Sequence, residues 1–404
     1  MKAHILIIAD GRSPTAQSWI SNIQSLDYEV SLISSFNCDP LPGLSHFHIQ
    51  PIAFSRFSSG TASKQTQRKR TGLKAVLRRF STIFQVFRYW LGPLTIPRYA
   101  KAYKKLIKQI QPDLVHALRI PFEGMLGSYT PQGIPFIAAT WGNDLTLHAL
   151  GSHMMVQFTK RCINRADGLS SDTHRDVELA FQQWGLAHGS PTLVVPGSGG
   201  LDLQLIEKSG QFVPAQYNIP PKQPYVVNPR GIRPGSVLQM VFFEAIPLVL
   251  KQQPDVCFIC PGLAGVTQAQ NWVDVFGGNE NIFLLPNLPQ EELWDLFRRS
   301  QVFVSPSRHD GTPNTLLESM ACGTFPIVGN IASLREWIEN GINGYLVNPG
   351  DPDQLASRIL DALHNTALRE DAAKRNHEII ENRASQARTL PKIDAFYQQF
   401  LSEK

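Results

Sequence analysis

The sequence predicts an α/β protein made of two doubly wound, Rossmann-like domains. A chain of 404 residues is longer than one hydrophobic core usually organises, so two domains are expected. In both halves, short apolar runs typical of buried parallel strands alternate with helical patterns. A glycine-rich break at 196–200 and a proline-rich stretch at 214–224 separate the halves. We therefore expect domains over 1–205 and 220–385, with ligands bound at the carboxyl ends of the strands and in the cleft between the domains.

Each half contributes five expected strands. In the first half they lie at 5–9, 29–33, 114–117, 136–139 and 193–195, and in the second at 225–227, 256–259, 282–285, 302–304 and 325–328. Helices are expected at 18–26, 291–299 and 313–321. A final helix within 386–404 carries Ile393, Phe396, Tyr397 and Phe400 on one stripe. We expect this helix to pack back on the N-terminal domain, because an apolar stripe needs a partner.

The composition is that of a folded protein from a reducing compartment. Hydrophobic residues make up 43% and charged residues 18% of the chain, which excludes a disordered protein. No apolar run approaches the ~20 residues that span a bilayer, and the apolar start at 5–9 is too short for a secretory signal. The five cysteines lack a disulfide-framework spacing. Cys257 and Cys260 lie inside an apolar run, which favours buried strand cysteines over a metal or redox pair. We expect a cytoplasmic protein.

Positive charge is concentrated in one segment. Residues 40–112 contain fourteen Lys or Arg and no Asp or Glu, although the net charge of the chain is only +5. The basic amphipathic part of this segment is 64–108, and an amphipathic helix is expected at 72–91. Two interpretations stay open: this helix binds an anionic membrane interface, or its apolar stripe packs on the domain. No nucleic-acid motif accompanies the charge, so nucleic acid is not an expected partner.

The segment 305–323 carries the strongest chemical signal. A buried strand ends at Ser305, a polar loop follows, and a helix is expected with Thr312 as its N-cap and Pro313 as its first residue. The free amides of the first helical turn, together with the helix dipole, form an anion pocket that fits a diphosphate. These amides belong to Asn314, Thr315 and Leu316.

Two carboxylates accompany this anion pocket. The apolar residues of the helix cluster on one face, so Glu318 is expected to point away from the core, toward the cleft. A carboxylate in that position can accept hydrogen bonds from two neighbouring hydroxyls, as a ribose or a hexose presents them. Asp310, in the loop just before the helix, can do the same beside it. A structural alternative, a capped helix with a solvated glutamate, explains the same residues.

The segment resembles the signature of glycosyltransferase family 4, retaining group 1 type enzymes of GT-B fold. The positions that match are Pro306, Ser307, Asp310, Glu318, Ser319, Ala321, Gly323 and Pro326. The resemblance implies that Glu318 binds the ribose of a sugar nucleotide and that the loop from His309 and Gly311 to Leu316 holds the diphosphate. Asp310 stands where the family usually has glutamate, and the resemblance implies that it contacts the donor sugar as a catalytic residue.

Other donor-site residues follow from the same resemblance. Arg230 matches the family arginine that neutralises the diphosphate, and Arg233 stands in for a lysine that is out of register. Gly262 ends the next strand, where the backbone passes close to the nucleotide, and Asn287 lies where the base is held.

The N-terminal half resembles the acceptor side of the family. His116 and Asp144 are the expected polar groups of the reaction centre, with a structural histidine and a helix cap as alternatives. Trp141, Gly142 and Asn143 form the turn before Asp144, with Trp141 at the position of a family histidine. A weaker match is the loop Gly11, Arg12 and Ser13, which follows the first strand where the family has a glycine-rich loop.

These observations predict a glycosyltransferase that moves a sugar from a UDP-, GDP- or ADP-sugar to an acceptor with retention of configuration. We expect no cofactor and no metal, because no metal-ligand cluster is visible in the sequence. A lipid-linked acceptor and a role in cell-surface polysaccharide, lipopolysaccharide or glycolipid synthesis are expected from the basic segment and the family. The alternatives are a sugar-nucleotide epimerase or inverting transferase on the same fold, or a catalytically weak glycosyltransferase-like partner protein.

Overall fold

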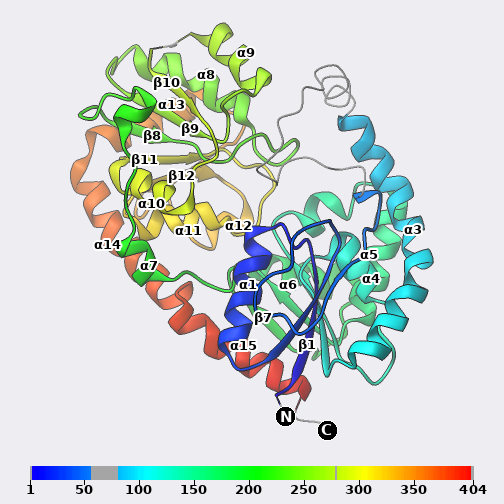
Figure 1. Ribbon diagram of the computed structural model, residues 1–404. Coiled ribbons are helices and arrows are strands. Elements are labelled where there is room, and N and C mark those ends of the chain that lie inside the picture. The colour runs from blue at the N-terminus through cyan, green and yellow to red at the C-terminus, as the bar shows by residue number, and fades with distance from the viewer. Residues whose placement is uncertain (1, 56–80, 278–279, 402–404) are drawn as a thin grey trace. The chain divides into compact units, whose positions relative to one another are not determined.

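The computed structural model describes residues 2–55, 81–277 and 280–401, and the chain divides into two compact units (Figure 1). Unit 1 comprises Met1–Gly199 and Leu390–Lys404, and unit 2 comprises Gly200–Thr389. The division falls inside the glycine-rich break at 196–200, a few residues before the expected end of the first domain. Residues 64–80 of the expected basic segment lie outside the described residues.

Unit 1 is built on a parallel seven-stranded sheet with the order β3-β2-β1-β4-β5-β6-β7. The strands are β1 (His4–Ala9), β2 (Glu29–Ser34), β3 (Phe47–Ile49), β4 (Leu114–Ala117), β5 (Phe136–Thr140), β6 (Gly168–Ser171) and β7 (Thr192–Val194). The α-helices are α1 (Pro14–Ser25), α3 (Ser81–Ile110), α4 (Met125–Gly127), α5 (His153–Arg165), α6 (His174–Leu179) and α15 (Gln386–Leu401), which belongs to unit 1 from Leu390 onward. Three π-helical turns complete it: η2 (Ile120–Gly124), η3 (Asp144–His148) and η4 (Ala180–Trp184).

Unit 2 repeats the design with a parallel six-stranded sheet in the order β10-β9-β8-β11-β12-β13. The strands are β8 (Tyr225–Val227), β9 (Cys257–Pro261), β10 (Ile282–Leu285), β11 (Val302–Ser305), β12 (Phe325–Gly329) and β13 (Tyr345–Val347). The helices are α7 (Leu203–Lys208), η5 (Pro214–Tyr217), α8 (Gln239–Leu250), α9 (Thr267–Phe276), α10 (Gln290–Arg299), α11 (Asn314–Ala321), α12 (Ala332–Arg335), α13 (Pro352–His364) and α14 (Thr366–Arg383).

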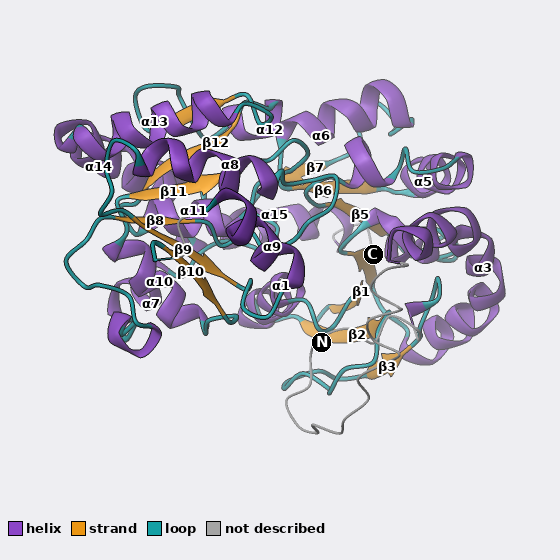
Figure 2. Ribbon diagram, turned by 90° about the horizontal axis from the view of Figure 1, so that it is seen from above, coloured by secondary structure: helices purple, strands orange, loops and turns teal. Residues whose placement is uncertain are grey.

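Helices cover both faces of each sheet (Figure 2), because the strands are apolar on both sides. Along β1, Ile5 belongs to the core shared with α1 and α15, whereas Leu6 belongs to the core shared with α3 and α5. Along β9, Cys257 and Cys260 point into opposite cores of unit 2, and both are buried. The expectation that they are buried strand cysteines is confirmed.

The predicted fold class, two doubly wound parallel sheets, is confirmed, and each expected strand is present. Three further strands were missed: β3, β6 and β13. These strands have three or four residues, and β6 reads Gly-Leu-Ser-Ser, which lacks the apolar run on which the prediction depended. In both sheets the order reverses beside the first strand of the unit, between β1 and β4 and between β8 and β11, as in Rossmann folds.

Helix α3 contains residues 81–91 of the expected helix and continues through Pro93 and Pro97 to Ile110, whereas residues 72–80 lie outside the described residues. One of its faces buries Ile96, Tyr103 and Ile107 in the core of unit 1. The opposite face is exposed to solvent and combines apolar and basic side chains. These exposed residues are Trp90, Leu91, Leu94, Arg98, Lys101, Lys104, Lys105 and Lys108. In the described part of the chain, no helix is both long enough and apolar enough to cross a membrane.

Candidate active site

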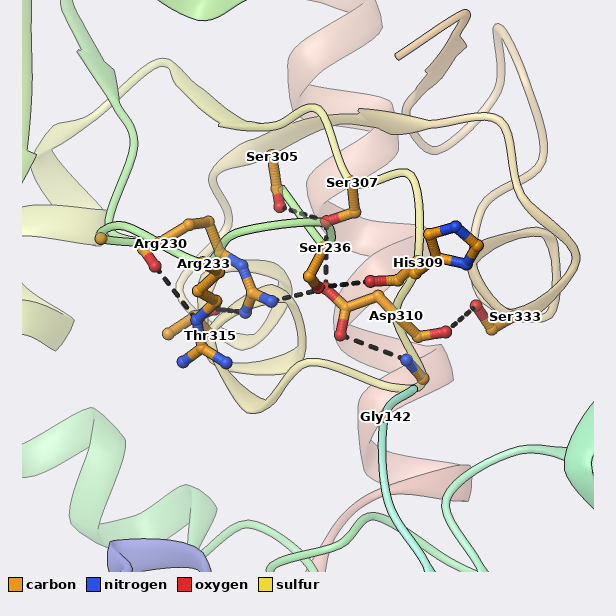
Figure 3. Close-up of polar contacts among 12 residues, drawn as sticks. Gly142, Arg230, Arg233, Ser236, Ser305, Ser307, His309, Asp310, Thr315 and Ser333 are labelled. Atoms are coloured by element: carbon orange, nitrogen blue, oxygen red, sulfur yellow. Dashed lines mark hydrogen bonds and ion pairs between the residues drawn. The ribbon is translucent and has the colours of Figure 1, made fainter. Parts of the chain in front are cut away.

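In unit 2, the loops that follow β8 and β11 meet where the strand order reverses, which is the usual ligand-binding edge of a doubly wound sheet. An isolated antiparallel bridge joins Val237 of the first loop to Ser307 of the second. The hydroxyl of Ser236 donates to the carbonyl of His309 at 2.5 Å, and the His309 amide donates to the Ser236 carbonyl at 3.1 Å (Figure 3). The two loops therefore form one polar platform.

Arg230 and Asp310 form a buried ion pair across this platform. Nη2 of Arg230 lies 2.5 Å from Oδ2 of Asp310, and the side chains are 4% and 10% exposed. Nη1 of Arg230 donates to the Thr315 hydroxyl at 3.1 Å, and the Ser307 hydroxyl donates to Asp310 at 3.0 Å (Figure 3). Nε of Arg230 is buried without a hydrogen-bond partner among the described residues. A fixed guanidinium with an unused N–H can bind a phosphate oxygen.

Asn228 and Gln239 fix the turn that presents Arg230. Oδ1 of Asn228 accepts from the Arg230 amide at 3.2 Å, and its Nδ2 donates to Gln239 at 2.7 Å. Gln239 in turn donates to the carbonyl of Gly231, whose φ of +59° suits glycine. Arg233 is exposed, and its Nε donates to the Arg230 carbonyl at 3.1 Å. Arg233 therefore supports the loop in which Arg230 lies.

Helix α11 begins one residue later than expected. Its N-cap is Pro313, which has no side-chain hydrogen bond to the first turn of the helix within the described part of the chain. The Thr312 hydroxyl does not cap it, because it accepts a hydrogen bond from the indole N–H of Trp337 at 2.9 Å. The Leu316 amide, which was expected to be free, donates to the Pro313 carbonyl at 3.0 Å. The two amides before it, those of Asn314 and Thr315, lie at the positive end of the helix dipole.

The side chain of Glu318 is buried, whereas it was expected to point away from the core, toward the cleft. Its side chain is buried between α11 and α10, where Nε2 of Gln290 donates to Oε1 at 2.8 Å. Burial raises the pKa of Glu318 to about 7, although Gln290 and Trp294 favour the charged form. The helical pattern placed Glu318 opposite the apolar face, but it carried no information on α10, which covers that side.

Gly262 and Asn287 come together at the carboxyl ends of β9 and β10. Gly262 has a φ of +81°, and a Cβ at this position would lie 2.8 Å from Oδ1 of Asn287. The Gly262 amide donates to the Pro286 carbonyl at 3.1 Å, and Asn287 is exposed. The backbone here is bare, so a ligand can approach it closely.

In unit 1, the structure does not place His116 at a reaction centre. Its side chain is fully buried, and Nδ1 and Nε2 form hydrogen bonds with the hydroxyls of Tyr397 at 2.8 Å and Ser170 at 2.9 Å. Trp19 packs edge-on against the ring at 5.4 Å. Burial lowers the pKa of His116 to about 3, so the imidazole is neutral. The structural alternative for this residue is the one that the geometry favours.

Asp144 is also engaged within unit 1. The carboxylate is fully buried, Oδ1 accepts from Nη2 of Arg119 at 2.5 Å, and Oδ2 accepts from the Trp141 amide at 3.1 Å. Gly142 has a φ of +63°, and its amide donates to Asp172 at 3.0 Å. Both Asp144 oxygens are thus occupied, which fits a residue that positions Arg119 and the turn better than a catalytic base.

The other turn residues have structural partners. The Asn143 carbonyl accepts the amides of Leu147 at 2.9 Å and His148 at 3.1 Å, and so starts η3. The Trp141 side chain packs beside the core shared by α1 and α15.

The loop after β1 is held by its own side chains. The Arg12 guanidinium donates to both oxygens of Asp10, at 3.0 and 2.9 Å, and Cζ lies 3.7 Å from the centroid of the Phe36 ring. Ser13 is the N-cap of α1. Gly11 packs so tightly that a Cβ would lie 2.5 Å from Sγ of Cys38. The expected glycine-rich loop is thus a compact turn with one paired arginine.

Several residues at the carboxyl edges of both sheets were not predicted from the sequence. Gln239 holds the loop that contains Arg230, Gln290 contacts Glu318, and Trp337 contacts Thr312, and no local pattern indicates these contacts. Arg119 lies two residues after β4, and a polar residue just beyond a parallel strand is a signal that could have revealed it. Among the described residues, no group of His, Cys, Asp and Glu side chains is arranged to hold a metal ion.

Two family models match the chain. The model of glycosyl transferases group 1 matches residues 212–379, and the glycosyl transferase 4-like model matches residues 89–173. Together they span both units and the Arg230–Asp310 platform. The family that the two matches indicate is that of the group 1, glycosyl transferase 4-like glycosyltransferases. The GT-B fold that the sequence resemblance implied is confirmed by solved structures of that architecture.

Similar proteins include curated enzymes and solved structures. A D-inositol 3-phosphate glycosyltransferase of Streptosporangium roseum is 26% identical over 238 residues, which are 56% of this chain and 52% of that protein. An O-antigen chain mannosyltransferase B of Escherichia coli is 34% identical over 88 residues, 22% of this chain and 23% of that protein. The chain thus spans about half the length of the first of these relatives and less of the second.

The similarity of fold extends over the whole chain. A sucrose-phosphate synthase from Thermosynechococcus elongatus has a TM-score of 0.73 at 16% identity, with 100% of both chains covered. The Anabaena protein HepE, in complex with UDP-glucose, has a TM-score of 0.68 at 16% identity and covers 98% of this chain and 99% of its own.

Proposed function

We propose that the protein is an active glycosyltransferase that moves a sugar from a nucleoside-diphosphate sugar to an acceptor, with retention of anomeric configuration. The observation that carries the proposal is the buried Arg230–Asp310 pair, whose unused Nε lies in the same platform as the first turn of α11. This combination suits a diphosphate, because it joins a fixed cation to the positive end of a helix.

Each residue of the platform receives a role in this reaction. Arg230 and the amides of Asn314 and Thr315 stabilise the negative charge that develops on the leaving diphosphate. Glu318 accepts hydrogen bonds from the ribose hydroxyls, in exchange for the bond from Gln290. Asp310 orients Arg230 and contacts the donor sugar. The positive groups neutralise the diphosphate, so we expect neither a cofactor nor a metal ion beside the donor.

The nucleotide is proposed to be uridine diphosphate. Support comes from HepE, which has been solved with UDP and with UDP-glucose. A thermal-shift screen of UDP-, GDP- and ADP-sugars tests this choice, and the UDP-sugars are expected to give the largest rise in melting temperature. Nuclear magnetic resonance of the product then reports the anomeric configuration. Conversion of the donor sugar to an epimer in the absence of acceptor would instead identify an epimerase, and an inverted product would overturn retention.

A matched pair of variants tests the proposed role of Glu318 in binding the donor. Glu318→Ala removes the carboxylate proposed to hold the ribose, and Glu370→Ala removes an exposed carboxylate of α14. We expect the first to raise the KM for the donor at least tenfold, equivalent to about 1.4 kcal/mol, and the second to leave it unchanged. Equal donor kinetics in both variants and the wild type would contradict the assignment.

We further propose a cytoplasmic enzyme that works at an anionic membrane surface on a lipid-linked acceptor, in cell-surface polysaccharide, lipopolysaccharide or glycolipid synthesis. The exposed face of α3 supports this, because Trp90, Leu91 and Leu94 precede a run of five cations. Relatives named for O-antigen and capsular polysaccharide support the pathway. The five cysteines are free thiols, which suits a reducing compartment.

Vesicle co-sedimentation tests the membrane contact. One variant carries Lys→Gln changes at 101, 104, 105 and 108 of α3. Its control carries the same four changes at the exposed lysines 222, 251, 374 and 392. We expect the first variant to lose binding to anionic vesicles and the control to keep most of it, because a cation contributes to membrane binding only when it lies close to the membrane surface. Equal sedimentation of the two variants would contradict the proposal.

A further inference from the structure

Arg88 of α3 is a cation at the carboxyl edge of the unit 1 sheet, and it forms no ion pair with a described residue. Its Nε is buried and has no hydrogen-bond partner among the described residues. Its Cζ lies 4.5 Å from the centroid of the Phe122 ring and 5.7 Å from that of Phe36. Aromatic faces can hold a guanidinium in place, but they satisfy none of its N–H groups.

Phe122, one of the two aromatic residues that contact Arg88, has a strained backbone. Phe122 has a φ of +72°, a left-handed backbone conformation that is strained for a residue other than glycine. Its ring packs against α3 at Gly92, where a Cβ would lie 2.8 Å from the ring. The strained residue thus holds an aromatic face against the helix that carries Arg88. Strain of this kind concentrates at ligand sites.

Arg119 supplies a second guanidinium at the same edge. It follows β4, next to the point where the strand order of unit 1 reverses. Its Nε and Nη2 both donate to Oδ1 of Asp144, and its side chain is 39% exposed. Nη1 has no hydrogen bond to a described residue, so one end of the fork is available to a ligand.

Both arginines influence the same side chain, that of His148. The pKa of His148 is lowered to about 4, mainly by burial and in addition by the charges of Arg119 and Arg88, whereas Asp144 opposes this shift. Nδ1 of His148 shares a hydrogen bond of 2.6 Å with the hydroxyl of Tyr89. The edge therefore brings two guanidinium groups, a phenol and a neutral imidazole together.

The carboxylates at this edge are already engaged. Asp10 is paired with Arg12, and Asp144 binds Arg119 and a backbone amide. Glu123 accepts a hydrogen bond from the Ser35 hydroxyl, and burial raises its pKa toward the neutral form. The charge of Arg88 is therefore left without an ion-pair partner among the described residues.

We infer that Arg88 and Arg119 form a subsite for an anionic group of phosphate type on the acceptor. The inference rests on the proposed glycosyl transfer and names the chemistry of its acceptor. Guanidinium groups are suited to phosphate oxygens, and the carboxyl edge at a topological switch point is where doubly wound sheets bind ligands. The phosphate belongs either to a soluble sugar phosphate or to a lipid headgroup, which α3 could draw from a membrane through its exposed face.

The test uses the full-length protein and three variants. Arg88→Gln removes the cation, Arg88→Lys keeps its charge without the fork, and Arg98→Gln removes an exposed arginine from the same helix as a matched control. Saturating UDP fills the diphosphate site of unit 2 in each titration, so that added phosphate reports on unit 1. UDP affinity is measured first, and it should be equal in all four proteins.

One arm titrates glucose 6-phosphate by calorimetry, and the other measures binding to phosphatidylcholine vesicles with and without phosphatidylinositol. We expect Arg88→Gln to weaken binding at least tenfold in one arm, with an intermediate loss in Arg88→Lys and a smaller loss in Arg98→Gln. Loss in the first arm identifies a soluble acceptor, and loss in the second alone identifies a lipid headgroup.

Equal affinities of Arg88→Gln and Arg98→Gln in both arms, or no binding by the wild type in either, would overturn the inference. A wild type that fails to bind UDP or any other sugar nucleotide would instead contradict the proposed function. The two failures are therefore distinguishable.

Discussion

The two units carry the same kind of sheet but differ in how the arginines at its carboxyl edge are paired. In unit 2, Arg230 follows β8 and is neutralised by Asp310, which follows the neighbouring β11. In unit 1, Arg119 follows β4 and is neutralised by Asp144, while Arg88 has no ion-pair partner among the described residues. A paired arginine stabilises the site before the ligand binds, whereas the charge of an unpaired arginine is balanced only when an anionic ligand binds. The difference suggests that unit 2 is preorganised for its ligand and that unit 1 depends on its ligand for charge balance.

The largest expected effect comes from breaking the pair in unit 2. Asp310→Ala leaves the Arg230 charge buried and uncompensated, which should lower the free energy of unfolding by about 3–5 kcal/mol. Chemical denaturation followed by circular dichroism measures this loss. Asp353→Ala, an exposed acid of α13, is the control and should change stability by less than about 1 kcal/mol. A small loss for Asp310→Ala would show that the pair is not buried in solution.

A second expected effect concerns pH and Glu318. The pKa of Glu318 is raised from 4.5 to about 7, so the folded state binds a proton that the unfolded state has released. Stability from this group is therefore full below pH 4.5 and falls as the pH rises toward about 7, by roughly 3 kcal/mol in all.

Glu318→Gln removes this titration while keeping an acceptor for Gln290. Denaturation curves from pH 4.5 to 8 should show a smaller fall in stability with pH for the variant than for the wild type. Parallel curves for the two proteins would mean that Glu318 titrates normally.

The buried histidine of unit 1 should behave in the opposite direction. The pKa of His116 is lowered from 6.5 to about 3, so its contribution to stability is present above pH 6.5 and is lost as the pH falls toward 3. His116→Phe leaves the Tyr397 and Ser170 hydroxyls without this partner and should cost about 1–3 kcal/mol at pH 7.

Donor turnover separates this structural role from a catalytic one. The His116→Phe protein should retain the wild-type kcat at a temperature where it is folded. A loss of kcat of a hundredfold or more would restore His116 as a reaction-centre residue.

The smallest expected effect comes from Arg88. Because this side chain has no ion pair with a described residue, Arg88→Gln should change the free energy of unfolding by about 1 kcal/mol or less, the value of its contacts with Phe122 and Phe36. Denaturation beside Asp310→Ala tests the contrast between the units directly. A loss as large as that of Asp310→Ala would mean that Arg88 has a partner in solution and that the two edges are alike.

The fold and the backbone of the unit 2 site could be predicted from short stretches of sequence. Apolar runs predict strands such as β1 and β9 because a buried parallel strand needs apolar residues on both faces. The pattern around Asp310 likewise places it in a loop between a strand and a helix, where it is found. These features depend on residues that are close together in the chain.

Contacts between distant elements could not be predicted in this way. The burial of Glu318 depends on Gln290, and the loss of the Thr312 cap depends on Trp337, each on a different element. His116 was expected at a reaction centre because strand ends carry ligands, but its register turns the ring toward Tyr397 in the C-terminal helix. Such outcomes are set by packing, which local sequence does not encode.

Unit 2 is proposed to bind a sugar nucleotide through Arg230 and Glu318. Calorimetric titration of UDP-glucose into the wild type, Arg230→Gln, Glu318→Ala and Arg98→Gln measures this binding. We predict saturable binding by the wild type and by Arg98→Gln, with at least tenfold weaker binding by the other two. Wild-type affinity in both Arg230→Gln and Glu318→Ala would contradict the claim.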